Sequence, residues 1–165
     1  MGSTGFFESG KPVLLHYDGT RWSKVAVPGV GAARAGLKDV VAGPGGQLWA
    51  VGEIQAPDKS WKALALHYNG RKWTEVPLPN GTGRLGSVTV SRGEPVVLEE
   101  KTEETSAALR YTGRKWVSMK LPADGAEPLA ASAVSASGRT VDVVGYRPAT
   151  GSQYVGPGAV LTARR

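Results

Sequence analysis

The sequence predicts an all-β protein built from antiparallel four-stranded sheets, and three observations lead to this class. The 165 residues include 23 glycines and 11 prolines, so about a fifth of the chain favours turns and disfavours long helices. Alternating apolar residues run into glycine-containing turns, as strands of hairpins do. A short motif of tyrosine, turn and tryptophan also recurs three times along the chain.

The repeated motif sets the size of the unit. It reads HYDGTRW at 16–22, HYNGRKW at 67–73 and RYTGRKW at 110–116. The tyrosines Tyr17, Tyr68 and Tyr111 lie 51 and 43 residues apart, and β-propeller blades repeat at about 40 to 50 residues. We therefore predict blades of four strands, called a to d from the inside outward.

The predicted strands follow this order along the chain. Residues 1–12 are a flexible leader or the end of an incomplete first blade. The half blade 13–27 supplies strands 13–17 and 22–27, and the blade 37–78 supplies 37–42, 47–52, 64–68 and 73–76. The blade 85–121 supplies 85–91, 95–100, 106–111 and 115–120, and the incomplete blade 129–165 supplies 129–136, 139–147 and 159–163.

Thirteen strands make about three blades of a β-propeller. Closed propellers typically have four to eight blades, so this number predicts a partial ring or a ring completed by self-association. Strands 13–17 and 159–163 both take position c, so the two ends cannot share one blade. Two copies would supply about six blades, and we predict a ring-forming homodimer if 165 residues are the natural length.

The aromatic residues of the motif have a structural interpretation. Asp18-Gly19 and Asn69-Gly70 suit hairpin turns, and the tyrosine and tryptophan of each hairpin can pack across the two strands or on a neighbouring blade. We expect the three tryptophans to be largely buried. The residues assigned to this structural repeat are Tyr17, Trp22, Tyr68, Trp73, Tyr111 and Trp116.

The run Leu48-Trp49-Ala50-Val51-Gly52-Glu53, followed by Tyr68 and Trp73, resembles the kelch repeats of galactose-oxidase-type β-propellers. The likeness is closest to a bacterial branch in which tyrosine, an Asx-Gly turn and tryptophan mark the outer hairpin. The resemblance implies a propeller fold and binding roles. It transfers no catalytic residue, because nothing here matches the copper ligands or the Cys–Tyr cofactor of the oxidase. Gly52 stands alone where kelch repeats usually have two glycines.

Several catalytic and cofactor classes are disfavoured by the residues present. The chain has no cysteine, which excludes disulfides, thiolate metal sites and a thiol nucleophile. Residues 5–11 have the spacing of a phosphate-binding loop, but Pro12 follows Lys11 where that motif needs serine or threonine. His16 and His67 occupy one repeat slot that holds Arg110 in the third copy, so a shared strand position explains them better than a metal site. We expect no cofactor and no bound metal.

Two acidic features raise the possibility of glycan cleavage. Asp18 begins a turn that resembles the Asp box of sialidases but is one residue short, and other repeats replace it by Asn69 and Thr112. Glycosidases need two carboxylates about 5 to 9.5 Å apart, and no such pair is visible in the sequence. A cluster of glutamates lies near the loop between strands b and c, where we expect it to be solvated: Glu99, Glu100, Glu103 and Glu104.

The basic residues carry the leading functional hypothesis. The formal charge is +6 and the pI is about 9.7, which favours anionic partners. In a propeller the a–b and c–d turns share one face, and cations recur in them: Arg21, Arg71, Lys72, Arg92, Arg114, Lys115 and Arg139. One interpretation is a binding face for an anionic polymer, with tyrosine and tryptophan nearby. The other is that these cations promote solubility and protect edge strands.

The sequence thus predicts a non-enzymatic binding module that recognises an anionic glycan or a protein partner through a basic face. The alternative is a structural protein that forms a ring by homo-oligomerisation, and a glycan hydrolase or lyase is the third hypothesis. We do not expect nucleic acid as a partner. No apolar run approaches the roughly 18 residues that span a bilayer, and the N-terminal residues lack the pattern of a signal peptide, so we expect a soluble chain without membrane insertion. The compartment stays open, and extracellular is one option.

Overall fold

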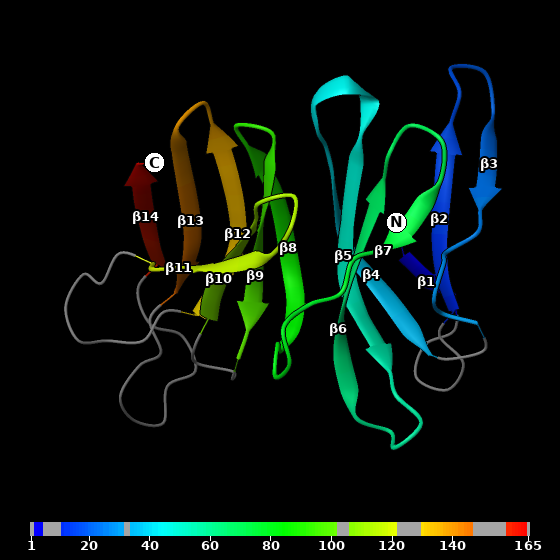
Figure 1. Ribbon diagram of the computed structural model, residues 1–165, viewed down its shortest axis with the longest axis horizontal. Coiled ribbons are helices and arrows are strands. Elements are labelled where there is room, and N and C mark those ends of the chain that lie inside the picture. The colour runs from blue at the N-terminus through cyan, green and yellow to red at the C-terminus, as the bar shows by residue number, and fades with distance from the viewer. Residues whose placement is uncertain are drawn as a thin grey trace.

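The computed structural model describes residues 2–4, 11–31, 34–101, 106–121, 130–146 and 158–164, with 2–4 and 158–164 described as backbone. The described residues form fourteen β-strands, and their one helical element is a short 3-10 turn, Pro44–Gly46. The prediction of an all-β protein is confirmed. The strands form four sheets that stand side by side in chain order (Figure 1).

Each sheet is an antiparallel meander in which every strand pairs with the next one along the chain. The first sheet contains β1 (Gly2–Thr4), β2 (Lys11–Tyr17) and β3 (Trp22–Val25), and the second contains β4 (Ala35–Ala42), β5 (Leu48–Gln55), β6 (Trp61–Tyr68) and β7 (Trp73–Glu75). The third sheet contains β8 (Arg84–Ser91), β9 (Glu94–Glu100), β10 (Ser106–Tyr111) and β11 (Trp116–Met119). The fourth contains β12 (Ala130–Ser137), β13 (Thr140–Tyr146) and β14 (Gly158–Arg164).

All thirteen predicted strands are present, with described ends that differ by at most three residues from the predicted ones. The predicted ends at 129 and 147 lie outside the described residues. The fourteenth strand, β1, lies within the predicted segment 1–12 and pairs with β2. The described strands therefore give sheets of three, four, four and three strands, and none of these sheets closes on itself.

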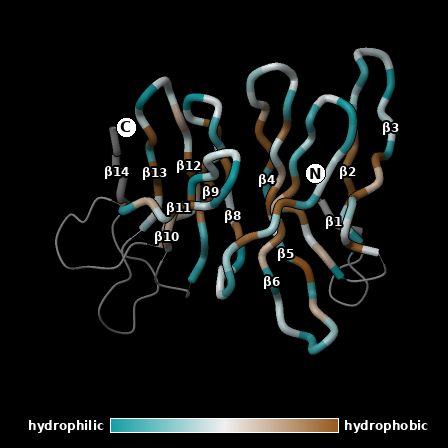
Figure 2. The backbone as a smooth tube through the Cα atoms, viewed as in Figure 1, coloured by the Kyte–Doolittle hydropathy of each residue, from teal (hydrophilic) through white to brown (hydrophobic). Residues whose placement is uncertain are grey.

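Apolar residues fill the spaces between consecutive sheets. Successive side chains of a strand point to opposite faces, so Val96 and Leu98 pack toward the fourth sheet while Val97 packs toward the second. Leu66 likewise packs toward the first sheet, where it shares an apolar cluster with Leu14 of β2. Figure 2 shows apolar residues along the strands and polar residues at the hairpin turns. Burial on both faces explains why the interior strands are continuous apolar runs.

A β-bulge recurs in the first strand of the second, third and fourth sheets. The register shifts lie between Leu37 and Asp39, between Leu85 and Ser87, and between Ala131 and Ala133. The partner residue across the bulge is Gly52 in the second sheet and Gly145 in the fourth, and in both a Cβ would collide with backbone of the bulged strand. The two backbones approach closely at this point, which explains why residue 52, the single glycine of the run 48–53, has no side chain.

Polar side chains at the bulges connect the first strands of consecutive sheets. The Asp39 carboxylate accepts hydrogen bonds from the Ser87 hydroxyl and the Val88 amide, each at 2.9 Å. The Ser87 hydroxyl in turn accepts a bond from the Val134 amide at 3.3 Å. Strands β4, β8 and β12 therefore lie next to one another in chain order.

Candidate functional site

The turns within sheets place the predicted cations along one edge of the stack. The β2–β3, β4–β5, β6–β7, β8–β9, β10–β11 and β12–β13 turns all lie at the same end of the sheets, which we call the turn edge (Figure 1). The seven predicted cations are exposed in these turns: Arg21, Arg71, Lys72, Arg92, Arg114, Lys115 and Arg139. The common placement of a–b and c–d turns is as the sequence predicts.

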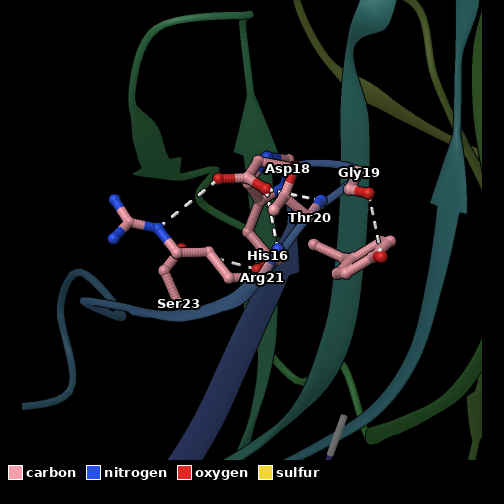
Figure 3. Close-up of polar contacts among 7 residues, drawn as sticks. His16, Asp18, Gly19, Thr20, Arg21 and Ser23 are labelled. Atoms are coloured by element: carbon pink, nitrogen blue, oxygen red, sulfur yellow. Dashed lines mark hydrogen bonds and ion pairs between the residues drawn. The ribbon is translucent and has the colours of Figure 1, made fainter.

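The outer hairpins are built by a side chain that binds its own turn. Asp18 Oδ1 accepts bonds from the amides of Thr20 at 2.8 Å and Arg21 at 2.9 Å (Figure 3). In the second sheet Asn69 Oδ1 accepts the corresponding bonds from Arg71 and Lys72, each at 3.0 Å. Any short side chain with an acceptor oxygen serves this purpose, which explains why the slot varies.

Asp18 is therefore a turn residue and is poorly suited to act as an acid. Hydrogen bonds from the backbone amides of Arg21 and, to a smaller extent, Thr20 hold the pKa of the Asp18 carboxyl below its ordinary value. The tyrosine of the hairpin also belongs to the turn, because the Tyr17 hydroxyl donates to the Gly19 carbonyl at 2.9 Å. Tyr68 makes the same bond to Gly70 at 3.0 Å.

The hairpins differ in charge. In the first sheet Arg21 lies 3.7 Å from the Asp18 carboxylate, which offsets its charge in a well-exposed pair. The second and third hairpins have neutral Asn69 and Thr112 at the position of Asp18. Within the described residues, no carboxylate lies within ion-pair distance of four cations: Arg71, Lys72, Arg114 and Lys115.

Two grooves open beside these cations at equivalent places between sheets. The first groove lies between the first and second sheets and has a volume of about 690 Å³. Its lining includes Tyr68, Arg71, Lys72 and Trp73 from the second sheet. The first sheet and the segment after it contribute Leu15, Trp22, Val25, Ala26 and Pro28. The second groove, between the second and third sheets, is smaller at about 320 Å³. It is lined by Tyr111, Arg114, Lys115 and Trp116 and by Val76, Pro77, Leu78 and Pro79.

The aromatic pair of each hairpin forms part of its groove. The ring centroids of Tyr68 and Trp73 are 5.4 Å apart, and those of Tyr111 and Trp116 are 5.1 Å apart. Trp116 is fixed against the preceding sheet because its Nε1 donates to the Pro77 carbonyl at 2.9 Å. Both tryptophans are half-buried, so each offers part of its ring to the groove.

The expectation that all three hairpin tryptophans are buried is wrong for Trp22, which is 67% exposed. Trp73 and Trp116 each pack back onto the sheet that precedes their own. Trp22 belongs to the first sheet, and no described sheet lies on that side of it (Figure 1). The exposure follows from the position of the sheet in the stack, which the motif itself does not encode.

The histidine slot has a structural explanation. The His67 ring stacks on Trp49 with centroids 4.4 Å apart, and its Nε2 lies 2.9 Å from Gln47 Oε1. Partial burial lowers the pKa of His67 below the ordinary value of a histidine. In the third sheet Arg110 takes the same slot and donates to Glu94 at 2.7 Å. The described residues contain no group of three or more His, Cys, Asp or Glu that could hold a metal ion.

One member of the acidic cluster, Glu99, is buried and not solvated as we expected. Glu99 is 3% exposed, lies on β9 at the slot of Gly52, and accepts a bond from the Gly83 amide at 2.8 Å. Glu100 also belongs to β9 and lies 3.6 Å from Arg84. Glu103 and Glu104 lie outside the described residues. Glu99 lies in the predicted strand 95–100, and alternation along that strand turns it inward, which an expectation of solvation based on charge misses.

Arg84 connects the second and third sheets through carboxylates that the sequence analysis did not single out. It lies 3.7 Å from Glu53 on β5, and Lys38 lies 3.3 Å from the other oxygen of Glu53. These groups belong to strand segments away from the turn edge, so Glu53 and its cations lie at a different end of the sheets from the uncompensated basic residues (Figure 1). No local pattern marks Arg84, because its partners are distant in sequence.

The sequence matches no protein-family model, and comparison with curated proteins finds no match. Within the described residues, no helix has the length and apolar character needed to cross a membrane.

Proposed function

We propose that the four sheets are consecutive blades of a β-propeller, with β4, β8 and β12 as innermost strands. The meander order of each sheet, the recurring bulge and the contacts between successive first strands support this arrangement. The shared position of the a–b and c–d turns supports it as well. Sheets of this kind stack around an axis and leave their turns on one face.

We further propose that the chain is a non-enzymatic module that binds an anionic glycan along the turn edge. One observation carries this proposal: two adjacent grooves repeat the same set of side chains, a tyrosine, an arginine, a lysine and a tryptophan. Arginine binds carboxylate and sulfate groups through its planar fork, and lysine adds a point charge. The tryptophan face can cover the apolar face of a sugar ring, since burying that surface is favourable.

The repetition favours a polymer over a compact ligand. A chain with a charge on each sugar could place successive groups at the cations of the two hairpins, Arg71 and Lys72 and then Arg114 and Lys115. Binding at two linked sites strengthens the affinity beyond that of either site. The open grooves offer no enclosed pocket with paired carboxylates, so a binding role fits them better than hydrolysis.

The test is a titration of fluorescein-labelled heparin fragments and oligogalacturonate, with neutral dextran as the uncharged comparison. The variant Arg71→Gln, Lys72→Gln, Arg114→Gln, Lys115→Gln should weaken binding of the charged chains by about tenfold or more and reduce its dependence on salt. Its stability should change by less than about 0.5 kcal/mol, because the four side chains are exposed.

A matched variant controls for net charge. Lys11→Gln, Lys24→Gln, Lys62→Gln, Lys120→Gln removes the same number of charges from exposed lysines outside the turns of the turn edge, and it should retain most of the affinity. Equal losses in both variants would show a non-specific charge effect. No binding of heparin or oligogalacturonate by the parent chain at low salt would reject the proposed function and leave solubility as the role of these cations.

A further inference from the structure

The first sheet exposes apolar residues at positions that are buried in the next two sheets. The pairs Tyr17–Trp22, Tyr68–Trp73 and Tyr111–Trp116 align the three outer hairpins, so Leu15, Leu66 and Leu109 occupy one slot. Leu15 is 49% exposed, whereas Leu66 and Leu109 are 0% and 8% exposed. The outer face of the first sheet therefore has the composition of an interface that no described residue covers.

The fourth sheet shows the complementary pattern at the other end of the stack. Val144 pairs with the residue just after the bulge, as Val51 and Leu98 do in the second and third sheets. Val51 and Leu98 are buried beneath the following sheet, at 0% and 2% exposure, but Val144 is 41% exposed. The two faces, neither of them packed against another described sheet, lie at opposite ends of the described stack (Figure 1).

The interior interfaces show which face covers which. The face with Leu109 and Trp116 packs on the face of the second sheet that carries Val51. The face with Leu66 and Trp73 packs in the same way on the first sheet, against Leu14. The outer faces of the first and fourth sheets are thus the two halves of this same kind of interface, separated because they belong to the ends of one stack.

We propose that the outer face of the fourth sheet of one copy docks on the outer face of the first sheet of a second copy, head to tail. The occupant of the Leu15 and Trp22 face is the Val144 face of another chain, because that kind of face covers the equivalent residues inside the stack. Two copies related by a twofold axis can form both such contacts in one dimer. This proposal does not rest on the proposed glycan binding, although Leu15 and Trp22 also border the first groove.

The test measures the mass of the intact chain in solution by sedimentation velocity over a range of concentrations. The parent should reach twice the 17.2 kDa of one chain. Leu15→Asp and Val144→Asp each introduce a charge at an exposed site, and each should raise the dissociation constant at least about tenfold without unfolding the chain. Trp61→Gln, at an exposed apolar residue outside both end faces, should leave association unchanged.

A mixing experiment isolates the head-to-tail geometry. Leu15→Asp retains an intact Val144 face and Val144→Asp retains an intact Leu15 face, so a mixture should form a mixed dimer although neither variant associates alone. If a variant loses its folded circular dichroism spectrum, Trp22→Gln replaces Leu15→Asp and Val144→Asn replaces Val144→Asp. A parent that stays monomeric at the highest concentration, variants that associate like the parent, or a mixture that stays monomeric would each overturn the proposal.

Discussion

At the scale of single residues, the same slot performs the same structural task with different chemistry in each repeat. Asp18 and Asn69 both bind the two amides of their turn, and His67 and Arg110 both bind the side chain at the start of the neighbouring strand. The turn slot needs a hydrogen-bond acceptor, and the histidine slot needs a side chain that can bind the residue at the start of the neighbouring strand. In both slots the charge of the side chain varies between repeats. This freedom lets the second and third hairpins accumulate positive charge without loss of the turn.

His67 predicts a pH dependence of stability. Its pKa in the folded chain lies below the ordinary histidine value of about 6.5, so the unfolded chain binds the proton more tightly. The stabilising contribution of neutral His67 is complete above about pH 6.5 and is lost as the pH falls below that value. The free energy of unfolding, measured in urea, should therefore decrease from about pH 8 to about pH 5.

His67→Phe keeps a ring on Trp49 but removes the titrating group, so it should reduce this decrease. The pKa values of the Asp18 and Asp58 carboxyls are also lowered from the ordinary aspartate value, so these groups are protonated only at more acid pH. If the free energy of unfolding of His67→Phe decreased between these two pH values as much as that of the parent, His67 would not be the group responsible.

At the scale of elements, the bulge opposite Gly52 fixes how the first two strands of the second sheet fit together. A Cβ at residue 52 would collide with the backbone of Gly36 and Leu37, and backbone cannot move aside as a side chain can. Gly36 lies in the same sheet, yet a Cβ there would meet nothing within 4 Å. The two glycines therefore form a matched pair for substitution.

We predict that Gly52→Ala lowers the free energy of unfolding by about 2 to 3 kcal/mol, because it overpacks a site with no room. Gly36→Ala should change it little or raise it slightly, since alanine restricts the unfolded chain. Urea unfolding followed by tryptophan fluorescence measures both values. Equal effects of the two substitutions would mean that the close approach at Gly52 does not constrain the sheet.

Strands and turns could be predicted from the sequence because both follow from local chemistry, namely alternation, Asx-Gly turns and the spacing of the repeated motif. Three features could not. β1 is three residues long and shows no alternation, and the exposure of Trp22 depends on whether another sheet lies beside it. The burial of Glu99 follows from the register of the bulge. The cations of the site were predicted by position, whereas the grooves beside them form only when two sheets pack.

At the scale of the whole molecule, apolar clusters, largely buried carboxylates and exposed cations occupy different regions of the stack. The spaces between sheets hold the apolar clusters, the carboxylates of Glu53 and Glu99 bind partners away from the turn edge, and the turn edge carries exposed cations beside two repeated grooves. A ligand that bound along this edge would cross from the second sheet to the third without disturbing either core. The central claim is that this edge is the binding surface.

The most direct test is a two-dimensional nitrogen–proton NMR titration of the parent chain with an oligogalacturonate. We predict that two sets of signals shift together with the same dissociation constant: the amides of Arg71, Lys72, Arg114 and Lys115 and the indole signals of Trp73 and Trp116. Signals from residues away from the turn edge, such as Lys38 and Glu53, should stay in place. Shifts confined to the opposite end of the sheets, or no shifts at saturating oligosaccharide, would contradict the claim.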